Sequence, residues 1–175
     1  SISTSISAAT GGNFEQLTAD STAVVTNVVD TIDTTTVSLS ATNSITEADT
    51  AISYTATLTN AAQGDVTVTL SNGDSITIAD GTTQGSISST VAADEDANID
   101  AGSISTSISS ATGGNFEDLQ VDSTAAVTAV TDTTDVTTVS LSATASITEA
   151  DSAITYTAAL TNATDSALTV NLSNG

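Results

Sequence analysis

Apolar and polar residues alternate along much of the chain, and this period of two predicts β-strands rather than helices. The apolar face of residues 51–59 consists of Ile52, Tyr54, Ala56 and Leu58. The apolar face of residues 65–71 consists of Val66, Val68 and Leu70. Further strands are expected at residues 37–41, 76–78, 87–91, 104–108 and 123–131, the last with two alternations left open. No segment has the pattern of a helix of useful length.

Turn-forming residues separate these strands. They fall at residues 60–64, 71–74, 79–81, 94–102 and 113–115. Seven short strands in about 100 residues, each with one polar face, are typical of an antiparallel two-sheet sandwich. The predicted fold class is therefore all-β, with tandem immunoglobulin-like antiparallel β-sandwich modules. The expected core is Ile52, Tyr54, Leu58, Val68, Leu70, Ile104 and Ile108, with Phe116 and Leu119 closing one end.

The chain contains an internal repeat. Residues 1–73 align without a gap to residues 103–175, and 54 of the 73 pairs are identical. A unit of this length is a whole small domain rather than a short solenoid repeat. We therefore expect three parts: residues 1–36 end a preceding module, residues 37–138 form a complete one, and residues 139–175 begin a following one. This arrangement predicts an excerpt from a longer array in which identical modules join end to end.

Composition narrows the function. The chain has 21 acidic residues, a formal net charge of −21, and no Lys, Arg, His or Cys. Nucleic acid and anionic membranes are excluded as partners because both require cationic side chains. No apolar run reaches membrane-spanning length, so direct membrane insertion is not expected. Nucleophile–base catalysis lacks its usual residues, and no enzyme is expected. Carboxylates and carbonyls are oxygen ligands, so the expected partner and cofactor is Ca²⁺.

The acidic residues of the expected module fall in turns, loops and strand ends. If every strand crosses the whole module, nine of these carboxylates gather at the pole from which the chain exits and five at the other. Nine close carboxylates repel one another, and a bound metal ion would relieve that repulsion. The best ligand set is Glu47, Asp49, Asp96, Asp100, Asp132 and Asp135. Equivalent positions at the other junctions are Asp30, Asp33, Glu149 and Asp151. The alternative is a solvated acidic surface that confers solubility.

The repeat resembles a known family. The turn Ser-Ile-Thr-Glu-Ala-Asp at 44–49 and the linker beginning Asp-Thr-Thr-Asp at 132–135 are similar to the extender repeats of giant bacterial RTX-type adhesins. That resemblance implies immunoglobulin-like sandwiches that bind calcium and separate a membrane-anchored end from ligand-binding domains. It also implies an extracellular location on the bacterial surface. The calcium-binding nonapeptide of these proteins is absent, so no β-roll is expected.

Two functions are compatible with these features. The first is a structural spacer, made rigid by calcium at the module junctions. The second is a calcium-dependent binding module that contacts carbohydrate or a solid surface directly. The second requires an acidic cluster that faces solvent, whereas the first requires one at a junction.

Overall fold

The computed structural model describes residues 1–174, and the chain divides into two compact units. The first unit is Ser1–Asp33, and the second begins at Thr34. All regular structure in the described residues is β-strand, which confirms the all-β prediction. None of these residues belongs to a helix long and apolar enough to cross a membrane. The first unit holds one antiparallel pair, β1 (Ile2–Thr4) and β2 (Val24–Thr26).

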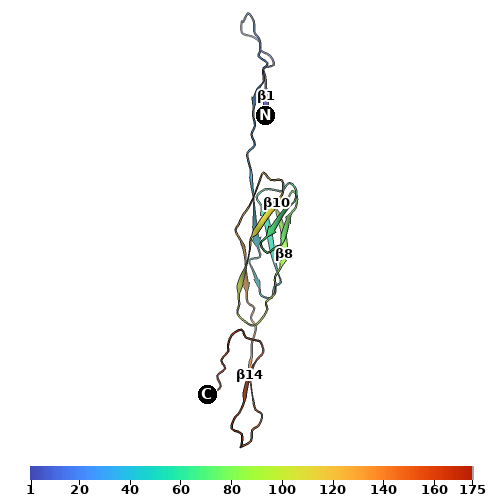
Figure 1. Cartoon of the computed structure of the whole chain (residues 1–175). Helices are drawn as coiled ribbons and strands as arrows, with labels where there is room; N and C mark the ends of the chain where they lie inside the picture. The colour runs from blue at the N-terminus through green and yellow to red at the C-terminus, as the bar shows by residue number, and fades with distance from the viewer. Residues whose placement is uncertain (175) are drawn as a thin grey trace. The chain divides into compact units, whose positions relative to one another are not determined.

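The second unit holds the remaining strands, most of them in a β-sandwich (Figure 1). They are β3 (Thr34–Ala41), β4 (Ser44–Thr46), β5 (Ala51–Leu58), β6 (Val66–Leu70), β7 (Ser75–Ile78), β8 (Gln84–Thr90), β9 (Gly102–Thr106), β10 (Ile108–Gly113), β11 (Asp118–Val121), β12 (Ala126–Thr131), β13 (Val139–Ala143) and β14 (Tyr156–Leu160). The sheets of the sandwich have the orders β11-β3-β5-β8, β10-β6-β7 and β4-β12-β9. β13 and β14 form a separate antiparallel pair.

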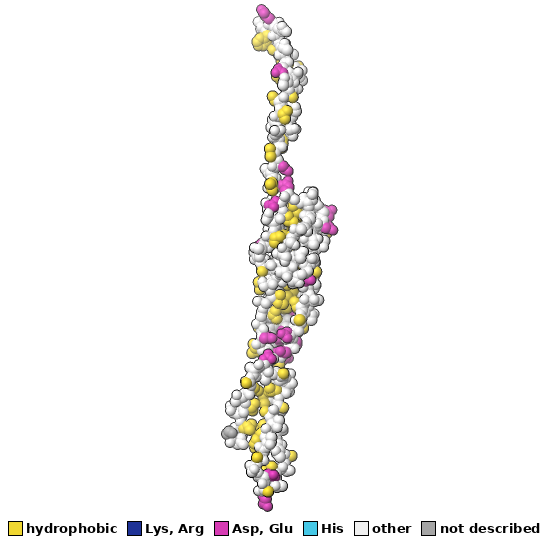
Figure 2. Space-filling model, viewed as in Figure 1, with side chains coloured by type: hydrophobic (Ala, Val, Ile, Leu, Met, Phe, Trp, Pro, Cys, Tyr) yellow, Lys and Arg dark blue, Asp and Glu magenta, His cyan; other side chains and the backbone are white. Residues whose placement is uncertain are grey.

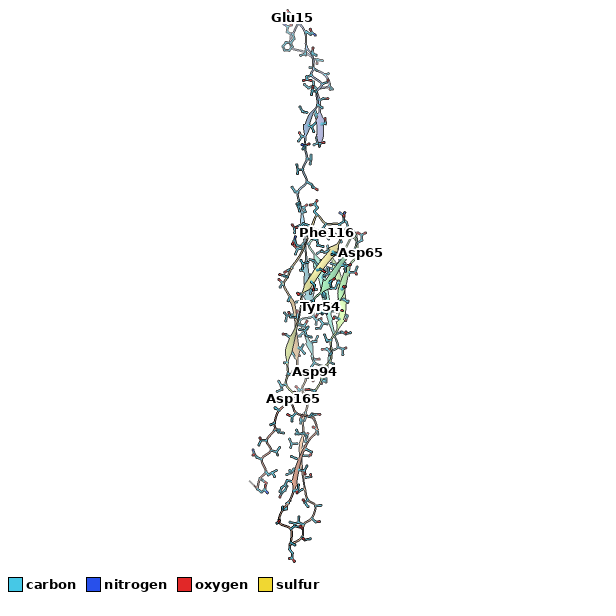
Figure 3. All side chains as sticks on the ribbon, viewed as in Figure 1. Glu15, Tyr54, Asp65, Asp94, Phe116 and Asp165 are labelled. Atoms are coloured by element: carbon cyan, nitrogen blue, oxygen red, sulfur yellow. The ribbon has the colours of Figure 1, made fainter. Side chains whose placement is uncertain are left out.

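One hydrophobic core joins the three sheets of the sandwich. Its buried apolar residues are Val37, Ile45, Ile52, Tyr54, Ala56, Leu58, Ala62, Val66, Val68, Leu70, Ile76, Ile78 and Ile108. The alternation predicted for β5 and β6 is confirmed, because every second residue of each strand is buried. Tyr54 lies in the middle of the sandwich (Figure 3), where its hydroxyl and that of buried Thr106 are 2.8 Å apart. Ile104, expected in the core, is only half-buried against it.

The sheets are mixed, which corrects the prediction of purely antiparallel sheets. β11 runs parallel to β3, and β12 runs parallel to β4. Both β4 and β11 are strands that the sequence pattern did not predict, because they are three and four residues long. Alternation over so few residues is too short to be recognised. The immunoglobulin-like assignment and the module boundaries at 36/37 and 138/139 stay predictions.

The structure tests two local predictions, the alternation of residues in β12 and the turn at residues 113–115. In β12 the inward residues are Ala126, Thr128 and Val130, so the second of the two alternations is the observed one. The turn expected at 113–115 forms with positive φ angles of 103° at Gly113, 75° at Gly114 and 51° at Asn115. A Cβ atom at Gly114 would lie 2.4 Å from the ring of Phe116 and 2.6 Å from Val66. Glycine therefore lets the half-buried Phe116 close one end of the core, as predicted.

The two ends of the sandwich carry different residues. Asp94 lies near one end, whereas Asp65 and Phe116 lie near the opposite end (Figure 3). The end near Asp94 is the one from which the chain continues, after β12, toward β13. We call this end the exit pole. Its loops, 47–50 and 91–101, contain four of the six residues in the best ligand set: Glu47, Asp49, Asp96 and Asp100.

Candidate metal centre

Glu47 is the residue around which the exit pole is organised. It directly follows β4, the short strand that pairs with β12. Its backbone N–H donates to the Thr131 carbonyl at 3.1 Å, and its carbonyl accepts from the Asp94 N–H at 3.1 Å. These bonds tie Glu47 both to the last strand of the sandwich and to the acidic loop. As a result the side chain is only 4% exposed.

The Glu47 carboxylate is only partly satisfied. Its Oε1 accepts hydrogen bonds from the Thr133 backbone N–H at 2.7 Å and from the Thr133 hydroxyl at 3.1 Å. Its Oε2 is buried and has no hydrogen-bond partner in the structure. Buried polar atoms in proteins almost always have a partner, since an unpaired one carries the full cost of leaving water. This oxygen is therefore the strongest sign of a ligand at the exit pole.

Further carboxylates surround Glu47. Among the described residues, two groups bring one oxygen from each member within 4.8 Å of the others. They are Glu47 with Asp100 and Asp132, and Glu47 with Glu95 and Asp135. Figure 2 shows acidic side chains gathered at this end of the sandwich. Glu47 belongs to both groups, so it links the 94–102 loop to the segment that follows β12.

The electrostatics of this cluster disfavour five negative charges in one place. Burial raises the pKa of the Asp100 carboxyl, and the charges of Asp94, Asp96, Glu47 and Asp132 raise it further. The Thr133 hydroxyl lies 3.1 Å from Glu47, 2.7 Å from Glu95 and 3.4 Å from Asp135, yet it has one proton to donate. The sequence contains no Lys, Arg or His that could compensate. A cation from solution would supply the missing charge.

The donor set fits a calcium ion. All the candidate ligands are oxygen atoms, which hard cations prefer, and there is no Cys or His in the chain to select a softer metal. Calcium accepts six to eight oxygens at about 2.3–2.6 Å, so oxygens on opposite sides of one ion are about 5 Å apart. The separation of up to 4.8 Å within each group is compatible with that distance.

Two further candidates at the exit pole have local partners. Asp49 accepts the Thr46 backbone N–H at 2.7 Å and the Thr46 hydroxyl at 2.9 Å. These two bonds, the backbone one first, lower the pKa of Asp49. Asp96 accepts the Asn98 backbone N–H at 2.6 Å and lies with Glu95 and Asp135 around an open hollow that Asp165 also lines. Neither Asp49 nor Asp96 belongs to the two groups above.

The candidates at the other junctions do not gather. Asp30 and Asp33 belong to the first unit, and Asp30 accepts the N–H of Thr31 at 3.1 Å. Asp151 accepts the Thr148 backbone N–H at 2.6 Å and its hydroxyl at 2.9 Å, as Asp49 does with Thr46. Within the described residues, neither these three nor Glu149 joins a group of three carboxylates. Residues 94–102, which supply Glu95 and Asp100 at the exit pole, lie outside the two repeated segments 1–73 and 103–175.

Two participants at the exit pole were not in the predicted ligand set. Glu95 lies between Asp94 and Asp96, and nothing in the pattern of that acidic run distinguishes the member that points toward Glu47. Thr133 lies between two predicted ligands, Asp132 and Asp135, but the chain is rich in threonine and one more carries no signal. Its backbone N–H contact with Glu47 depends on the pairing of β4 with β12.

Comparison with known proteins identifies the family of the chain. A family model described as the LapA domain matches residues 33–133 and again residues 135–175. The chain belongs to the LapA domain family. LapA proteins are large adhesins, so membership indicates a structural, non-enzymatic part of an adhesin with a cell-surface or extracellular location. The two matches correspond to the internal repeat, the second covering part of a copy. No curated protein matches the chain.

Proposed function

We propose that this LapA-family chain is a spacer segment of a bacterial cell-surface adhesin, in which calcium at the exit pole stiffens the junction between modules. Its tandem organisation, its all-β architecture and its adhesin family support a structural role. The proposal includes the more specific assignment of the chain to the extender repeats of RTX-type adhesins. In it, the modules hold ligand-binding domains of the same protein away from the cell.

One observation carries the calcium part of the proposal: the buried, unpartnered Oε2 atom of Glu47. Glu47 would offer a ligand that has already left water, and Asp100 and Asp132 would add oxygens from the acidic loop and the exit segment. Asp135 and Glu95 would hold the exit segment from the other side. These residues belong to three separate stretches of the chain, so a shared ion would restrict how the exit segment moves.

The proposal also predicts that the junction is rigid outside the cell and flexible before export. Extracellular calcium modules commonly bind with dissociation constants of about 0.1–1 mM, a range that suits the outside of a cell and not the cytosol. Before export, the carboxylates of the exit pole would repel one another. After export, binding would neutralise them. An ion bound only to the folded state stabilises it by about 2.7 kcal/mol at a hundredfold excess over the dissociation constant.

The test compares thermal unfolding in calcium and in chelator for the native chain and for Glu47→Gln. We expect calcium to raise the melting temperature of the native chain. Glu47→Gln should not respond to calcium, and in chelator it should melt at the same temperature or higher, because it removes one of the crowded charges. Glu149→Gln is the matched control, since it changes the equivalent residue of the other copy, and it should respond as the native chain does.

Small-angle scattering of the same variants tests the spacer role. Calcium should narrow the distribution of end-to-end distances of the native chain and leave that of Glu47→Gln unchanged. Equal melting and equal scattering with calcium and with chelator would refute the calcium mechanism. A calcium response that persists in Glu47→Gln would show that calcium binds elsewhere in the chain, and would refute the assignment of the site to Glu47.

A further inference from the structure

A cavity of about 190 Å³ lies beside Glu47 at the exit pole. Its walls come from β4, β9 and β12 and from the loops that follow β4 and β8. Every lining residue falls between Ile45 and Val130, within the sandwich and within the first stretch that the family model matches. The cavity is therefore a feature of the module itself and does not involve the partial copies of the repeat.

One part of the cavity wall is apolar. Ile45 of β4, Ile104 of β9 and Val130 of β12 line it, together with Val91 after β8. The last three pack against the hydrophobic core but are only partly buried. They therefore present apolar surface to the cavity, and hydrocarbon that covered this surface would bind favourably.

Another part of the wall is acidic, and it includes Glu47, Asp49, Asp94 and Asp100. Figure 2 shows apolar side chains beside the acidic side chains at this end of the sandwich. Glu47 is 4% exposed, and its Oε2 atom has no hydrogen-bond partner. Such an oxygen calls for a donor or a cation. The cavity thus combines an unsatisfied negative group with an apolar wall.

The spacing of the carboxylate oxygens suits a primary ammonium group. Oxygens of Glu47, Asp100 and Asp132 lie within 4.8 Å of one another, and the first two residues also line the cavity. An ammonium group donates three hydrogen bonds of about 2.8 Å in a roughly tetrahedral arrangement, which separates its acceptors by about 4.6 Å. One ammonium group would therefore reach an oxygen of each carboxylate.

The volume of the cavity limits the length of the chain that carries the ammonium. At roughly 30 Å³ for each water-sized group, the cavity of about 190 Å³ holds about six such groups. A lysine side chain fits, since it has four methylenes and one nitrogen. We propose that the cavity binds an alkylammonium group of this length, with its nitrogen at the carboxylates and its methylenes against Ile104 and Val130. The chain contains no Lys, so a side chain of a second copy cannot provide this group.

An alkylammonium group and a calcium ion would use the cavity differently. Calcium takes oxygen ligands and gains nothing from the apolar wall. An alkylammonium group uses the carboxylates and the wall together, and each methylene that it buries improves the dissociation constant about fourfold. Both ligands would use Glu47, so we expect them to compete. This competition rests on the calcium site proposed above, whereas binding of the amine does not.

Titration of the native chain in chelator with methylamine, propylamine and n-butylamine tests the inference. The ionic strength is held constant, the pH keeps every amine protonated, and binding is followed from amide chemical shifts. We expect the affinity to rise with each methylene, up to about 60-fold from methylamine to n-butylamine. Equal affinities for the three amines would overturn the inference, because they would show only general attraction of cations to an acidic surface.

Variants separate the two parts of the wall. Val130→Thr keeps the size of the side chain and should weaken n-butylamine binding several-fold while leaving methylamine binding unchanged. Val127→Thr is the matched control, because Val127 belongs to the same strand but is 57% exposed and does not line the cavity. Glu47→Gln should weaken binding of every amine at least tenfold. Equal effects of Val130→Thr and Val127→Thr would contradict the proposed position of the methylenes. Melting of each variant in chelator verifies that it is folded.

Two further measurements identify the source of the ammonium and keep the inference separate from the calcium proposal. A short peptide with one internal lysine should bind as n-butylamine does if a partner protein supplies the group, and its acetylated form should not bind. Binding of n-butylamine without the peptide would identify a free amine as the source. Failure of both to bind the native chain would overturn the inference, whatever calcium does. If n-butylamine binds but does not weaken calcium binding, the amine site stands and the calcium site lies elsewhere.

Discussion

The β3–β5 pair and the β13–β14 pair have nearly the same sequence and the same register, yet one is buried and the other is exposed. In both, a threonine directly after the first strand accepts a backbone N–H: Ser53 of β5 donates to Thr42, and Thr155, which directly precedes β14, donates to Thr144, each at 3.2 Å. The register is therefore encoded within the pair itself. Burial is not encoded in the pair, because β3 and β5 pack against other strands of the sandwich, whereas β13 and β14 form a separate two-stranded sheet whose residues are mostly exposed.

The largest difference between the two pairs should appear on core truncation. Leu58 is 3% exposed in β5, and its equivalent Leu160 is half-buried in β14. Leu58→Ala should lower the free energy of unfolding of the sandwich by about 2–5 kcal/mol, because it leaves a cavity in a packed core. Leu160→Ala should change it by less than about 0.5 kcal/mol. Urea unfolding followed by far-UV circular dichroism measures both.

The outcome separates two views of the repeat. Equal costs for the two variants would mean that β14 is packed in solution as β5 is, so that the exposed face seen here is covered.

A smaller contrast should come from the buried hydroxyl pair. Tyr54→Phe removes the partner of Thr106, whose side chain is 2% exposed, and leaves that hydroxyl unpaired inside the sandwich. We expect a loss of about 1–3 kcal/mol, the cost of an unsatisfied buried polar group. Tyr156→Phe should have no measurable effect on the isolated chain, since its ring is 43% exposed. Similar losses for the two variants would contradict the difference in burial.

Much of the fold could be predicted from the sequence because its strands are amphipathic. The period of two in β5 and β6 places Ile52, Leu58 and Val68 in the core without any knowledge of topology. The parallel pairing of β11 with β3 could not be predicted, because β11 is four residues long and contains Asp118 and Gln120. Pairings of this kind depend on how distant segments meet, and local alternation does not record that.

The candidate site could likewise be predicted only in part from the sequence. Counting which end of the module each turn occupies brought Glu47, Asp100 and Asp132 together, and their oxygens do lie within 4.8 Å of one another. The count could not reveal that Glu47 is buried, because this depends on the short β4 strand beside β12. It also gave no reason to separate Asp49 from Glu47, although Asp49 instead bonds to the Thr46 turn.

The smallest expected contrast concerns a turn that forms in both copies. Asp122 accepts the Thr124 N–H at 2.9 Å, and its equivalent Asp20 accepts the Thr22 N–H at 2.8 Å. Hydrogen bonds from the backbone and then the side chain of Thr124 lower the pKa of Asp122 below its ordinary value of 3.8. The side-chain and then the backbone bonds of Thr22 lower the pKa of Asp20 in the same way. The turn therefore needs no surrounding sandwich.

These lowered pKa values predict how acid affects the sandwich. A carboxyl whose pKa is lower in the folded state adds stability above pH 3.8, and this stability is lost as the pH falls through the folded-state pKa. Asp122→Asn should therefore melt slightly below the native chain at neutral pH, and the gap should close in acid. Asp20→Asn should leave the main melting transition unchanged at every pH, because the turn it caps lies in the first unit. Calorimetry in chelator, from neutral pH to pH below 3.8, measures both. A gap for Asp122→Asn that widens in acid would contradict the assigned hydrogen bonds, and a shift for Asp20→Asn would mean that the first unit unfolds together with the sandwich.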